Sequence, residues 1–367
     1  MSGSRTMADA SNIEWTDATW NIITGCTLVD DGCTNCYAAH LIASWPAIGN
    51  HPSRKGLARQ NAAGVAKFTG EVRFNEAWLD QPLRWKKPRR IFVCAHGDLF
   101  HESVPDEWLD RVFAVMALCP QHTFQVLTKR PDRAREYLSG LGPGGNLDIF
   151  VRGHGRLLRG AENATRNMGK LEFNPARKWP LPNVWLGTSV SDQASADKRI
   201  PDLLATPAAV RFLSMEPLLG AVDLTDLQRP AGAGTHHYSA LDCDVDPDDD
   251  GEWRGATIDW VIVGGESGPN ARPMHPDWPR SLRDQCNAAG VPFFFKQWGQ
   301  WVPRAGTTWS EWLMLDGTRH SGGFETRQHL MSVLPEDSCG IERIGKRAAG
   351  RLLDGREWNE MPGVRDG

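Results

Sequence analysis

The chain has 367 residues, of which 40% are hydrophobic and 23% are charged, and its formal net charge is −4. This composition can build a packed core and excludes wholesale disorder. The longest apolar runs are strand-sized, far short of the roughly 20 residues that a membrane-spanning helix needs. The N-terminal sequence MSGSRTMADA lacks an apolar signal core. We therefore expect a cytoplasmic protein with no membrane partner, whose eight cysteines stay reduced.

The charge is unevenly distributed along the chain. Residues 242–252, with the sequence DCDVDPDDDGE, hold seven acids and no base, so the remainder carries a net charge of +3. We interpret the acidic stretch as a solvated loop. The body of the protein is then mildly basic, although the overall charge is negative.

Seven short runs rich in Val, Ile, Phe and Trp recur along the chain and are nearly continuous rather than alternating. This pattern is typical of parallel strands that are covered on both faces. The predicted strands are Thr19–Thr24, Ile91–Ala95, Thr123–Thr128, Val184–Thr188, Val210–Ser214, Ile258–Gly264 and Val291–Lys296.

Helical patterns lie between these runs. The sequence Ser103-Val-Pro-Asp106 predicts a helix N-cap, Pro276–Ala289 predicts a helix that Gly290 ends, and Lys346–Leu353 predicts a short helix. Strands that alternate with helices indicate an α/β protein, with a β/α barrel or a doubly wound sheet.

The strand count favours one barrel over the two domains that the length first suggests. We place this barrel at residues 12–300, with loop insertions at 139–182 and 228–257. Residues 301–367 then form a C-terminal extension.

Each predicted strand ends in small, polar or charged residues. In parallel α/β folds such ends converge on one face, where ligands bind, so we expect a shared polar site. Glycines at Gly264–Gly268 would let the backbone approach a ligand closely, or form a plain turn. The charged residues at the strand ends are Asp98, Lys129, Arg130, Glu216, Glu266 and Lys296.

Three cysteines follow the first predicted strand with the spacing C-x6-C-x2-C: Cys26, Cys33 and Cys36. In a reducing compartment such a group favours a metal or a cluster over a disulfide. Structural zinc needs four ligands, and His40 would complete a Cys3His site. A [4Fe–4S] cluster held by three cysteines instead keeps one iron open for a cofactor, and an all-sulfur trio suits it.

Ordered motifs along most of the chain carry a resemblance to a known family. The motifs are Trp20-Asn21-x-x-Thr24-Gly25-Cys26, Gly32-Cys33-x-x-Cys36-Tyr37, Gly97-Asp98-Leu99-Phe100, Leu127-Thr128-Lys129-Arg130-Pro131, Trp185-Leu186-Gly187-Thr188-Ser189, Leu213-Ser214-x-Glu216-Pro217-Leu218, Gly264-Gly265-Glu266-Ser267-Gly268 and Phe295-Lys296-Gln297-Trp298-Gly299. With these motifs the chain resembles phage- and prophage-encoded three-cysteine-motif proteins of unknown function, which are related to radical S-adenosylmethionine enzymes.

The resemblance implies a partial, TIM-barrel-like (β/α) barrel of about six to seven parallel strands. It also implies that Cys26, Cys33 and Cys36 hold a [4Fe–4S] cluster, whose open iron binds S-adenosylmethionine for reductive cleavage to a 5′-deoxyadenosyl radical. We expect a catalytic part for Asp98, Lys129, Glu216, Glu266 and Lys296, and cofactor binding by Tyr37, Asp98, Thr188, Ser214, Gly264 and Gly265.

The substrate is left open at this point, with nucleic acid or a nucleobase as one candidate. Basic clusters at 85–90 and 129–135 could contact phosphates. Stacking faces could come from Trp15, Trp20, Trp45, Trp179, Trp298 and Trp301. The alternative function is a non-catalytic zinc or iron–sulfur protein of phage origin that binds nucleic acid. Expected partners are an unidentified reductant and a companion three-cysteine-motif protein.

Overall fold

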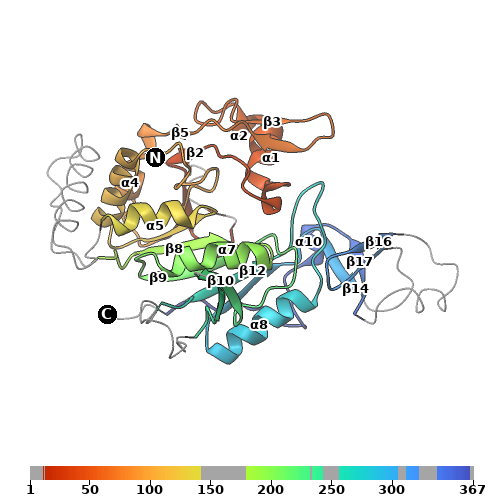
Figure 1. The fold of residues 1–367 in the computed structure, drawn as a ribbon. Helices are drawn as coiled ribbons and strands as arrows, with labels where there is room; N and C mark the ends of the chain where they lie inside the picture. Colours follow the sequence, from red (N-terminus) through yellow and green to blue (C-terminus); the bar gives the residue numbers. More distant parts are fainter. Residues whose placement is uncertain are drawn as a thin grey trace, which may run out of the picture. The chain divides into compact units, whose positions relative to one another are not determined.

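Seven parallel strands form one sheet in the order β1-β6-β7-β8-β9-β12-β13, and helices connect them (Figure 1). The computed structural model describes residues 11, 13–141, 179–231, 234–242, 256–304, 311–321 and 337–363. The seven strands confirm the expected α/β class and the partial β/α barrel. The chain divides into two compact units, Met1–Thr188 with Asp202–Arg211, and Ser189–Pro201 with Phe212–Gly367.

The first unit contains the first strands of the barrel. They are β1 (Ala18–Trp20), β6 (Arg90–Val93), β7 (Thr123–Thr128) and β8 (Val184–Ser189). Only Ser189, the last residue of β8, falls outside the unit. The parallel register pairs Ala18 with Ile91 and Phe124 with Val184. All six residues of β8 are buried, as expected of a strand covered on both faces.

Two helices of this unit pack together through aromatic rings. They are α4 (Asp106–Leu118) and α5 (Pro131–Ser139). The rings of Phe113 and Tyr137 are 5.4 Å apart, and the Tyr137 hydroxyl donates a hydrogen bond to Asp110 at 2.9 Å. The expected cap at Ser103 is wrong, because α4 begins at Asp106 after Pro105, whose fixed φ suits the residue that enters a helix.

The predicted strand Thr19–Thr24 is two strands in different sheets. After β1 the chain breaks at Asn21, whose side-chain oxygen accepts a hydrogen bond from the His96 amide. Then β2 (Ile23–Thr24) pairs antiparallel with β5 (Arg73–Phe74). At Asn21 this side-chain hydrogen bond takes the place of the strand pairing that the apolar sequence pattern predicts to continue to Thr24.

A small helical layer follows β2. It comprises a 3-10 turn (Asp31–Cys33), α1 (Tyr37–Ser44) and α2 (Pro46–Gly49). Helix α1 packs on α2 and on the hairpin of β3 (Ala58–Gln60) and β4 (Ala66–Phe68). Its core is apolar and small, with Ala39, Ile42, Ile48 and Leu57 fully or almost fully buried. A second 3-10 turn (Glu76–Trp78) and α3 (Gln81–Arg84) lead into β6.

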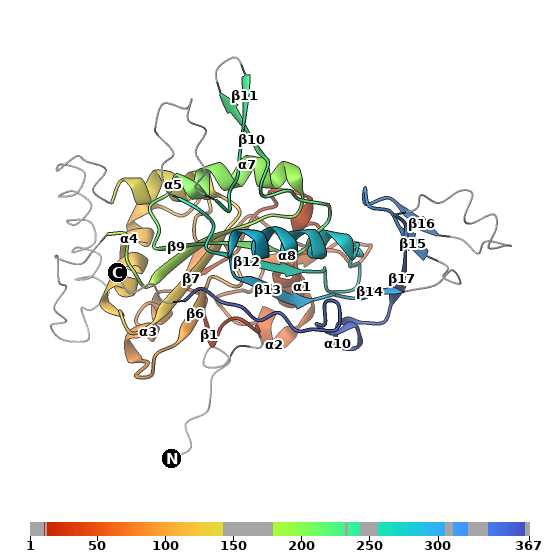
Figure 2. The same ribbon diagram turned by 90° about the horizontal axis from the view of Figure 1, so that it is seen from below.

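The second unit holds the last strands of the barrel. They are β9 (Val210–Met215), whose first two residues fall outside the unit, β12 (Trp260–Gly264) and β13 (Phe293–Gln297). Figure 2 shows α8 (Asp277–Ala289) running along β12 and β13. The prediction that Gly290 ends this helix is confirmed, with φ of 67° in the left-handed region. Helix α7 (Gln193–Leu204) has its first nine residues in this unit.

The predicted insertions are described only in part. Residues 142–178, and residues 243–255 with most of the acidic stretch and Cys243, lie outside the described residues. The described part of the second insertion contains a hairpin of β10 (Leu227–Ala231) and β11 (Gly234–Tyr238).

The C-terminal extension forms an antiparallel sheet in the order β14-β17-β15-β16. Its strands are β14 (Trp301–Arg304), β15 (Glu311–Leu313), β16 (Arg319–Ser321) and β17 (Cys339–Arg343). Helix α10 (Lys346–Ala349) is shorter than predicted, because Gly350 takes a positive φ of 71° and turns the chain. The tail then follows the edge of β13, where the Phe295 amide donates to the Trp358 carbonyl at 3.0 Å.

Tryptophans join segments of this second unit. The indole N–H of Trp260, Trp278 and Trp298 each donates to the carbonyl oxygen of a residue at least 37 positions away. All three rings are buried, so these tryptophans serve packing while their polar atoms remain satisfied. Among the described residues, none of the helices has the length and apolar character needed to span a bilayer.

Candidate functional site

The cysteine loop, residues 26–36, begins directly after a glycine that no other residue can replace without rearrangement. Gly25 has φ of 98°, and a Cβ there would stand 2.0 Å from the Glu71 carbonyl oxygen. Its amide donates to the His96 carbonyl at 3.0 Å, which joins the loop to the turn after β6. The loop therefore starts at the carboxyl end of the first strands of the barrel, where ligands bind in parallel α/β folds.

The three cysteines of this loop are partly exposed and form no disulfide. Cys26 opens the loop, Cys33 ends the 3-10 turn, and Cys36 is the N-cap residue of α1. The backbone amides of Ala38 and Ala39, in the first turn of that helix, act against the rise that burial causes in the pKa of Cys36. Within the described part of the chain, no three His, Cys, Asp or Glu side chains are already arranged around the position of a single metal ion.

Asp98 is the centre of a buried polar network beside Cys26. Its Oδ1 accepts the Thr128 hydroxyl at 2.7 Å and the Phe100 amide at 3.0 Å. Its Oδ2 accepts the Lys129 amide at 3.1 Å and Nη1 of Arg130 at 3.0 Å. Because four donors occupy a carboxylate that is 5% exposed, Asp98 holds other groups in position.

Arg130 connects this network to the cysteine loop. Its Nη1 also lies 3.7 Å from the Cys26 sulfur, and its Nη2 donates to the Thr27 hydroxyl at 2.5 Å. Its Nε donates to Glu102 at 2.7 Å. The guanidinium is thereby fixed on three sides and presents positive charge to a cysteine sulfur.

A second cation from the end of β7 holds the middle of the loop. Nζ of Lys129 lies 3.1 Å from Oδ1 of Asp30, and both side chains are mostly buried. The positive charge of Lys129 also acts on Cys36. Residues that follow β7 thus hold the cysteine loop at its start, through Arg130, and at its middle, through Lys129.

Burial dominates the acidity of the Cys26 and Cys36 thiols. Burial, followed by the Asp98 charge, raises the pKa of Cys26 to about 12, against an opposing effect of Arg130. Burial also raises the pKa of Cys36, while amides of α1 and Lys129 act in the opposite direction. Cysteines ligate metals as thiolates, so binding of a metal here would release protons, and the surrounding cations favour the thiolate form.

Two further expected cofactor residues lie in the first unit. The Tyr37 hydroxyl donates to the Ala95 carbonyl at 2.8 Å, and its side chain is 47% exposed next to Cys36. Thr188 is fully buried, and its hydroxyl donates to the Thr128 carbonyl at 2.9 Å. In the structure as described, Tyr37 offers an accessible ring, whereas the Thr188 hydroxyl is engaged with the backbone of β7.

In the second unit, three strand ends form a separate charged cluster. Nζ of Lys296 lies 2.6 Å from Oε2 of Glu216, and the Gln297 amide nitrogen donates to Oε1 of Glu216 at 2.9 Å. Gly264 lies against this pair, because a Cβ there would be 3.3 Å from the Glu216 carboxyl carbon. The structure therefore brings together Glu216, Lys296 and Gly264.

Glu266 and Ser214, from the same unit, have other surroundings. Glu266 is 5% exposed and forms a bidentate ion pair with Arg272, with Nη2 at 2.6 Å from Oε1. Ser214 is buried at the end of β9, and its carbonyl accepts the Val190 amide. At Gly265 the group that approaches closely is the Trp298 carbonyl, whose oxygen would stand 2.0 Å from a Cβ at this position.

The expected stacking faces are wrong for most of the tryptophans. Trp15, Trp20, Trp298 and Trp301 are at most 6% exposed and belong to the core. Trp45, at 56% exposed, does offer an open ring. The indole N–H groups of Trp20, Trp298 and Trp301 each donate to a backbone carbonyl, which lets the rings be buried, and sequence alone does not reveal those acceptors.

The two basic clusters differ in how their charges are used. In the cluster at 129–135, all four cations have carboxylate partners: Lys129 with Asp30, Arg130 with Asp98, Arg133 with Asp106, and Arg135 with Asp202. In the cluster at 85–90, Lys86 and Lys87 are exposed, while Arg90 pairs with Asp17 at 2.9 Å.

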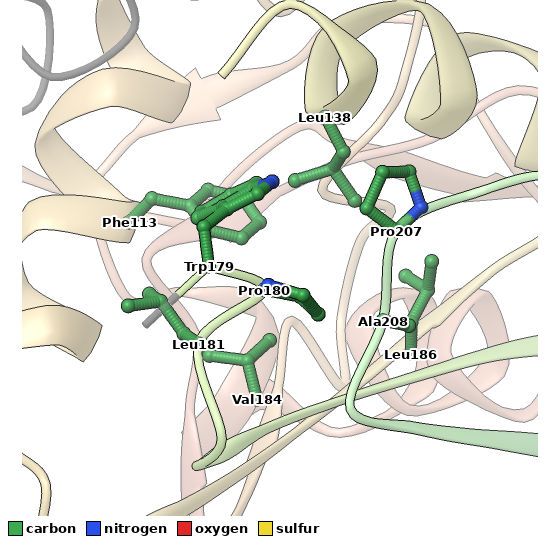
Figure 3. A pocket seen from close by; sticks show the side chains of 9 residues that line it. All are labelled: Phe113, Leu138, Trp179, Pro180, Leu181, Val184, Leu186, Pro207 and Ala208. Atoms are coloured by element: carbon green, nitrogen blue, oxygen red, sulfur yellow. The ribbon is translucent and has the colours of Figure 1, made fainter. Parts of the chain in front are cut away.

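An apolar pocket in the first unit lies between α4, α5 and the start of β8 (Figure 3). Phe113, Leu138, Trp179 and Val184 are among its lining residues, and none of the residues that line it is titratable. It therefore offers no acid, base or nucleophile, and we do not place chemistry there.

Arg54, near the cysteine loop, escapes the sequence analysis. Arg54 donates from Nε to Nδ1 of His96 at 2.9 Å, although the two are 42 positions apart. His96 is visible in the sequence as part of a strand end, whereas Arg54 lies in an irregular stretch after α2 and has no pattern that marks it.

The fold and this site define a class: a partial β/α barrel with a three-cysteine loop at the carboxyl end of its first strands. A family model matches residues 10–362, and the chain belongs to that family, described as "Protein of unknown function (DUF5131)". No curated protein matches the chain. No solved structure matches it either.

Proposed function

We propose that this protein is a phage-type iron–sulfur enzyme of the radical S-adenosylmethionine kind, with a [4Fe–4S] cluster held by Cys26, Cys33 and Cys36. When bound, the cluster supplies an electron and an open iron position for the reductive cleavage of S-adenosylmethionine. The proposed substrate is a nucleobase, free or within a nucleic acid.

One observation carries the proposal: three partly exposed thiols lie on one loop at the carboxyl end of a parallel strand, next to Arg130 and Lys129. A thiolate-bound cluster is anionic, and nearby cations and amide donors to its sulfurs stabilise it. We propose the amides of Ala39 and Ala38, which act against the rise that burial causes in the pKa of Cys36, as donors of this kind.

The donor set favours a cluster over structural zinc. Zinc in a structural site takes four protein ligands, and the cysteine loop has three thiols. The histidine that would complete a Cys3His site is His40 on α1, whose Nδ1 contacts the Ser44 hydroxyl at 3.3 Å. A cluster needs no fourth protein ligand, and the fourth iron is then left for the cofactor.

The residues around the loop have separate parts in this proposal. Arg130 balances negative charge at Cys26, and Asp98 holds Arg130 in place. Lys129 holds Asp30 and thereby the middle of the loop. The exposed Tyr37 ring beside Cys36 provides an apolar face for the cofactor. In the second unit, Glu216 and Lys296 are the proposed substrate-side acid and base groups.

Metal analysis tests the cluster. After anaerobic purification or reconstitution, we expect about four irons and four sulfides per chain. A variant with Cys26, Cys33 and Cys36 all replaced by Ala should lose both together. Cys339→Ala is the matched control, because that thiol is also partly exposed and unpaired but lies outside the loop, and it should keep both. One zinc per chain with no sulfide would contradict the proposal and support the non-catalytic alternative.

Product analysis tests the chemistry. The reduced, cluster-loaded protein should convert S-adenosylmethionine to 5′-deoxyadenosine and methionine, and the triple variant should not. A loaded protein that binds S-adenosylmethionine but yields no 5′-deoxyadenosine under strong reduction would exclude the enzyme.

A further inference from the structure

Arg54 is held rigidly in the turn that follows α2. Its guanidinium lies over the Trp78 ring, 5.4 Å from the ring centroid, and its Nε donates to Nδ1 of His96 at 2.9 Å. The ring of His51 packs on the same tryptophan at 5.3 Å. An aromatic face and a ring nitrogen together fix the plane and the direction of the guanidinium.

No carboxylate neutralises this guanidinium within the described part of the chain. Burial alone lowers the pKa of Arg54, with no acidic group acting against it. Nearby arginines differ: Arg73 pairs with Glu71, and Arg130 pairs with Asp98. A partly buried cation without a counter-charge is costly, which is why such groups are normally paired.

The outer edge of the guanidinium is open to a ligand. Nε is used by His96, and neither Nη1 nor Nη2 has a hydrogen-bond acceptor in the described residues. Neither atom is among the buried polar atoms that lack a partner, so both reach solvent. Two parallel N–H groups that point outward match two oxygens of one oxyanion.

His96 acts as a neutral acceptor in this arrangement. Because Arg54 donates to Nδ1, the ring proton is on Nε2. Burial and the Arg54 charge lower the pKa of His96 to about 3, so the ring stays neutral at physiological pH. It therefore orients Arg54 without adding a charge of its own.

The residues on either side of this contact, Ser53 and His96, are hydrogen-bonded to the base of the cysteine loop. The carbonyl of Ser53, next to Arg54 in sequence, accepts the Thr24 hydroxyl at 2.6 Å. The carbonyl of His96 accepts the Gly25 amide at 3.0 Å. His96 and the residue before Arg54 thus contact the two residues that immediately precede Cys26.

We propose that Arg54, oriented by His96 and Trp78, is a binding site for a phosphate group beside the cysteine loop. Both carboxylate and phosphate fit the guanidinium fork, but a phosphate monoester carries up to two negative charges and gains more from an uncompensated, partly buried cation. The inference deepens the proposed function by giving the substrate a phosphate, yet it requires no cluster. It can therefore fail or succeed separately from the iron–sulfur proposal.

Calorimetric titration of the full chain tests the site, with iron-free and cluster-loaded protein measured side by side in low-salt chloride buffer. The probes are inorganic phosphate, AMP, adenosine and acetate. We expect phosphate and AMP to bind in both preparations, adenosine to bind much more weakly than AMP to iron-free protein, and acetate to bind at least tenfold more weakly than phosphate. Tighter binding of AMP than of phosphate assigns the group to a nucleotide, and equal binding assigns it to free phosphate.

Matched variants give the decisive comparison. Arg54→Ala should weaken phosphate binding at least tenfold, while Arg73→Ala, which removes a neighbouring but ion-paired arginine, should leave it unchanged. His96→Asn keeps an acceptor in the place of Nδ1 and should preserve binding, whereas His96→Leu should weaken it. Should Arg54→Ala not fold, Arg54→Lys serves instead, because it keeps the charge and loses the fork. Equal binding by wild type and the Arg54 variant, acetate binding as tight as phosphate binding, or no oxyanion binding by the wild type would each overturn the proposal.

Discussion

Nη1 of Arg130 lies between two groups of opposite character, 3.0 Å from Oδ2 of Asp98 and 3.7 Å from Sγ of Cys26. The ion pair is almost completely buried, with both side chains at most 10% exposed. Asp98 therefore determines where the positive charge stands relative to the cysteine loop. A change at Asp98 should affect folding stability and the loop together.

We expect Asp98→Asn to lower the free energy of unfolding by about 3 kcal/mol, because it leaves Arg130 without its buried partner. Urea unfolding of the metal-free protein measures this loss. Asp106→Asn is the control: it breaks the Asp106–Arg133 pair, whose aspartate is 43% exposed, and should cost less than about 1 kcal/mol. Equal losses for the two variants would contradict the structural role given to Asp98.

The pairing of Asp98 with Arg130 could be anticipated from the sequence. The two residues follow consecutive strands of a parallel sheet, and β6 and β7 are neighbours, so their ends must meet. The strands of the parallel sheet could also be predicted from the sequence, because fully buried strands appear there as continuous apolar runs. The break at Asn21 was not found, because it depends on a side-chain bond to the His96 amide 75 positions away.

The Arg54–His96 pair was missed for the same physical reason. Arg54 lies in an irregular turn, where no helical or strand period marks which side chains point inward. Its position follows from tertiary contacts with Trp78 and with His96. The tryptophans show the reverse error, since Trp20 and Trp301 suggested open stacking faces and are buried instead.

The charge of Arg130 should also tune a bound cluster. Replacing Arg130 by Gln removes a cation 3.7 Å from the Cys26 sulfur. A cation stabilises the reduced cluster, which carries one more negative charge, so the variant should have a lower reduction potential than the wild type. Redox titration followed by EPR measures the shift. Arg133→Gln, whose guanidinium pairs with Asp106 instead, should leave the potential unchanged; an equal shift in both variants would contradict the assignment.

Gly265 should be intolerant of a side chain for reasons of packing. A Cβ there would stand 2.0 Å from the Trp298 carbonyl oxygen, which belongs to the backbone and cannot move alone. We expect Gly265→Ala to lower the free energy of unfolding by roughly 3 kcal/mol. In Gly220→Ala the nearest atom would be 3.5 Å away, an ordinary contact, and the loss should stay below about 1 kcal/mol. Thermal and urea unfolding distinguish the two, and a tolerated Gly265→Ala would show that this backbone contact is not required.

His96 should make the protein sensitive to acid. Its pKa is about 3 in the folded chain, lowered by burial and by the Arg54 charge, against 6.5 for an ordinary histidine. Between these values the unfolded chain binds a proton that the folded chain does not, so the free energy of unfolding falls as the pH falls below about 6.5. The upper limit for one group is about 1.4 kcal/mol per pH unit, and partial exposure of the ring reduces it.

His96→Asn isolates this contribution, because it keeps an acceptor for Nε of Arg54 and cannot be protonated in this range. From pH 6.5 to pH 5 the wild type should lose about 1 kcal/mol more of its unfolding free energy than the variant. The buffers must be free of phosphate, since the proposed ligand of Arg54 would stabilise the folded state. His101, His122 and His275, whose pKa values burial also lowers, contribute equally to both proteins and cancel in the difference. Parallel stability curves for the two proteins would mean that His96 takes up its proton in the folded chain as readily as in the unfolded one.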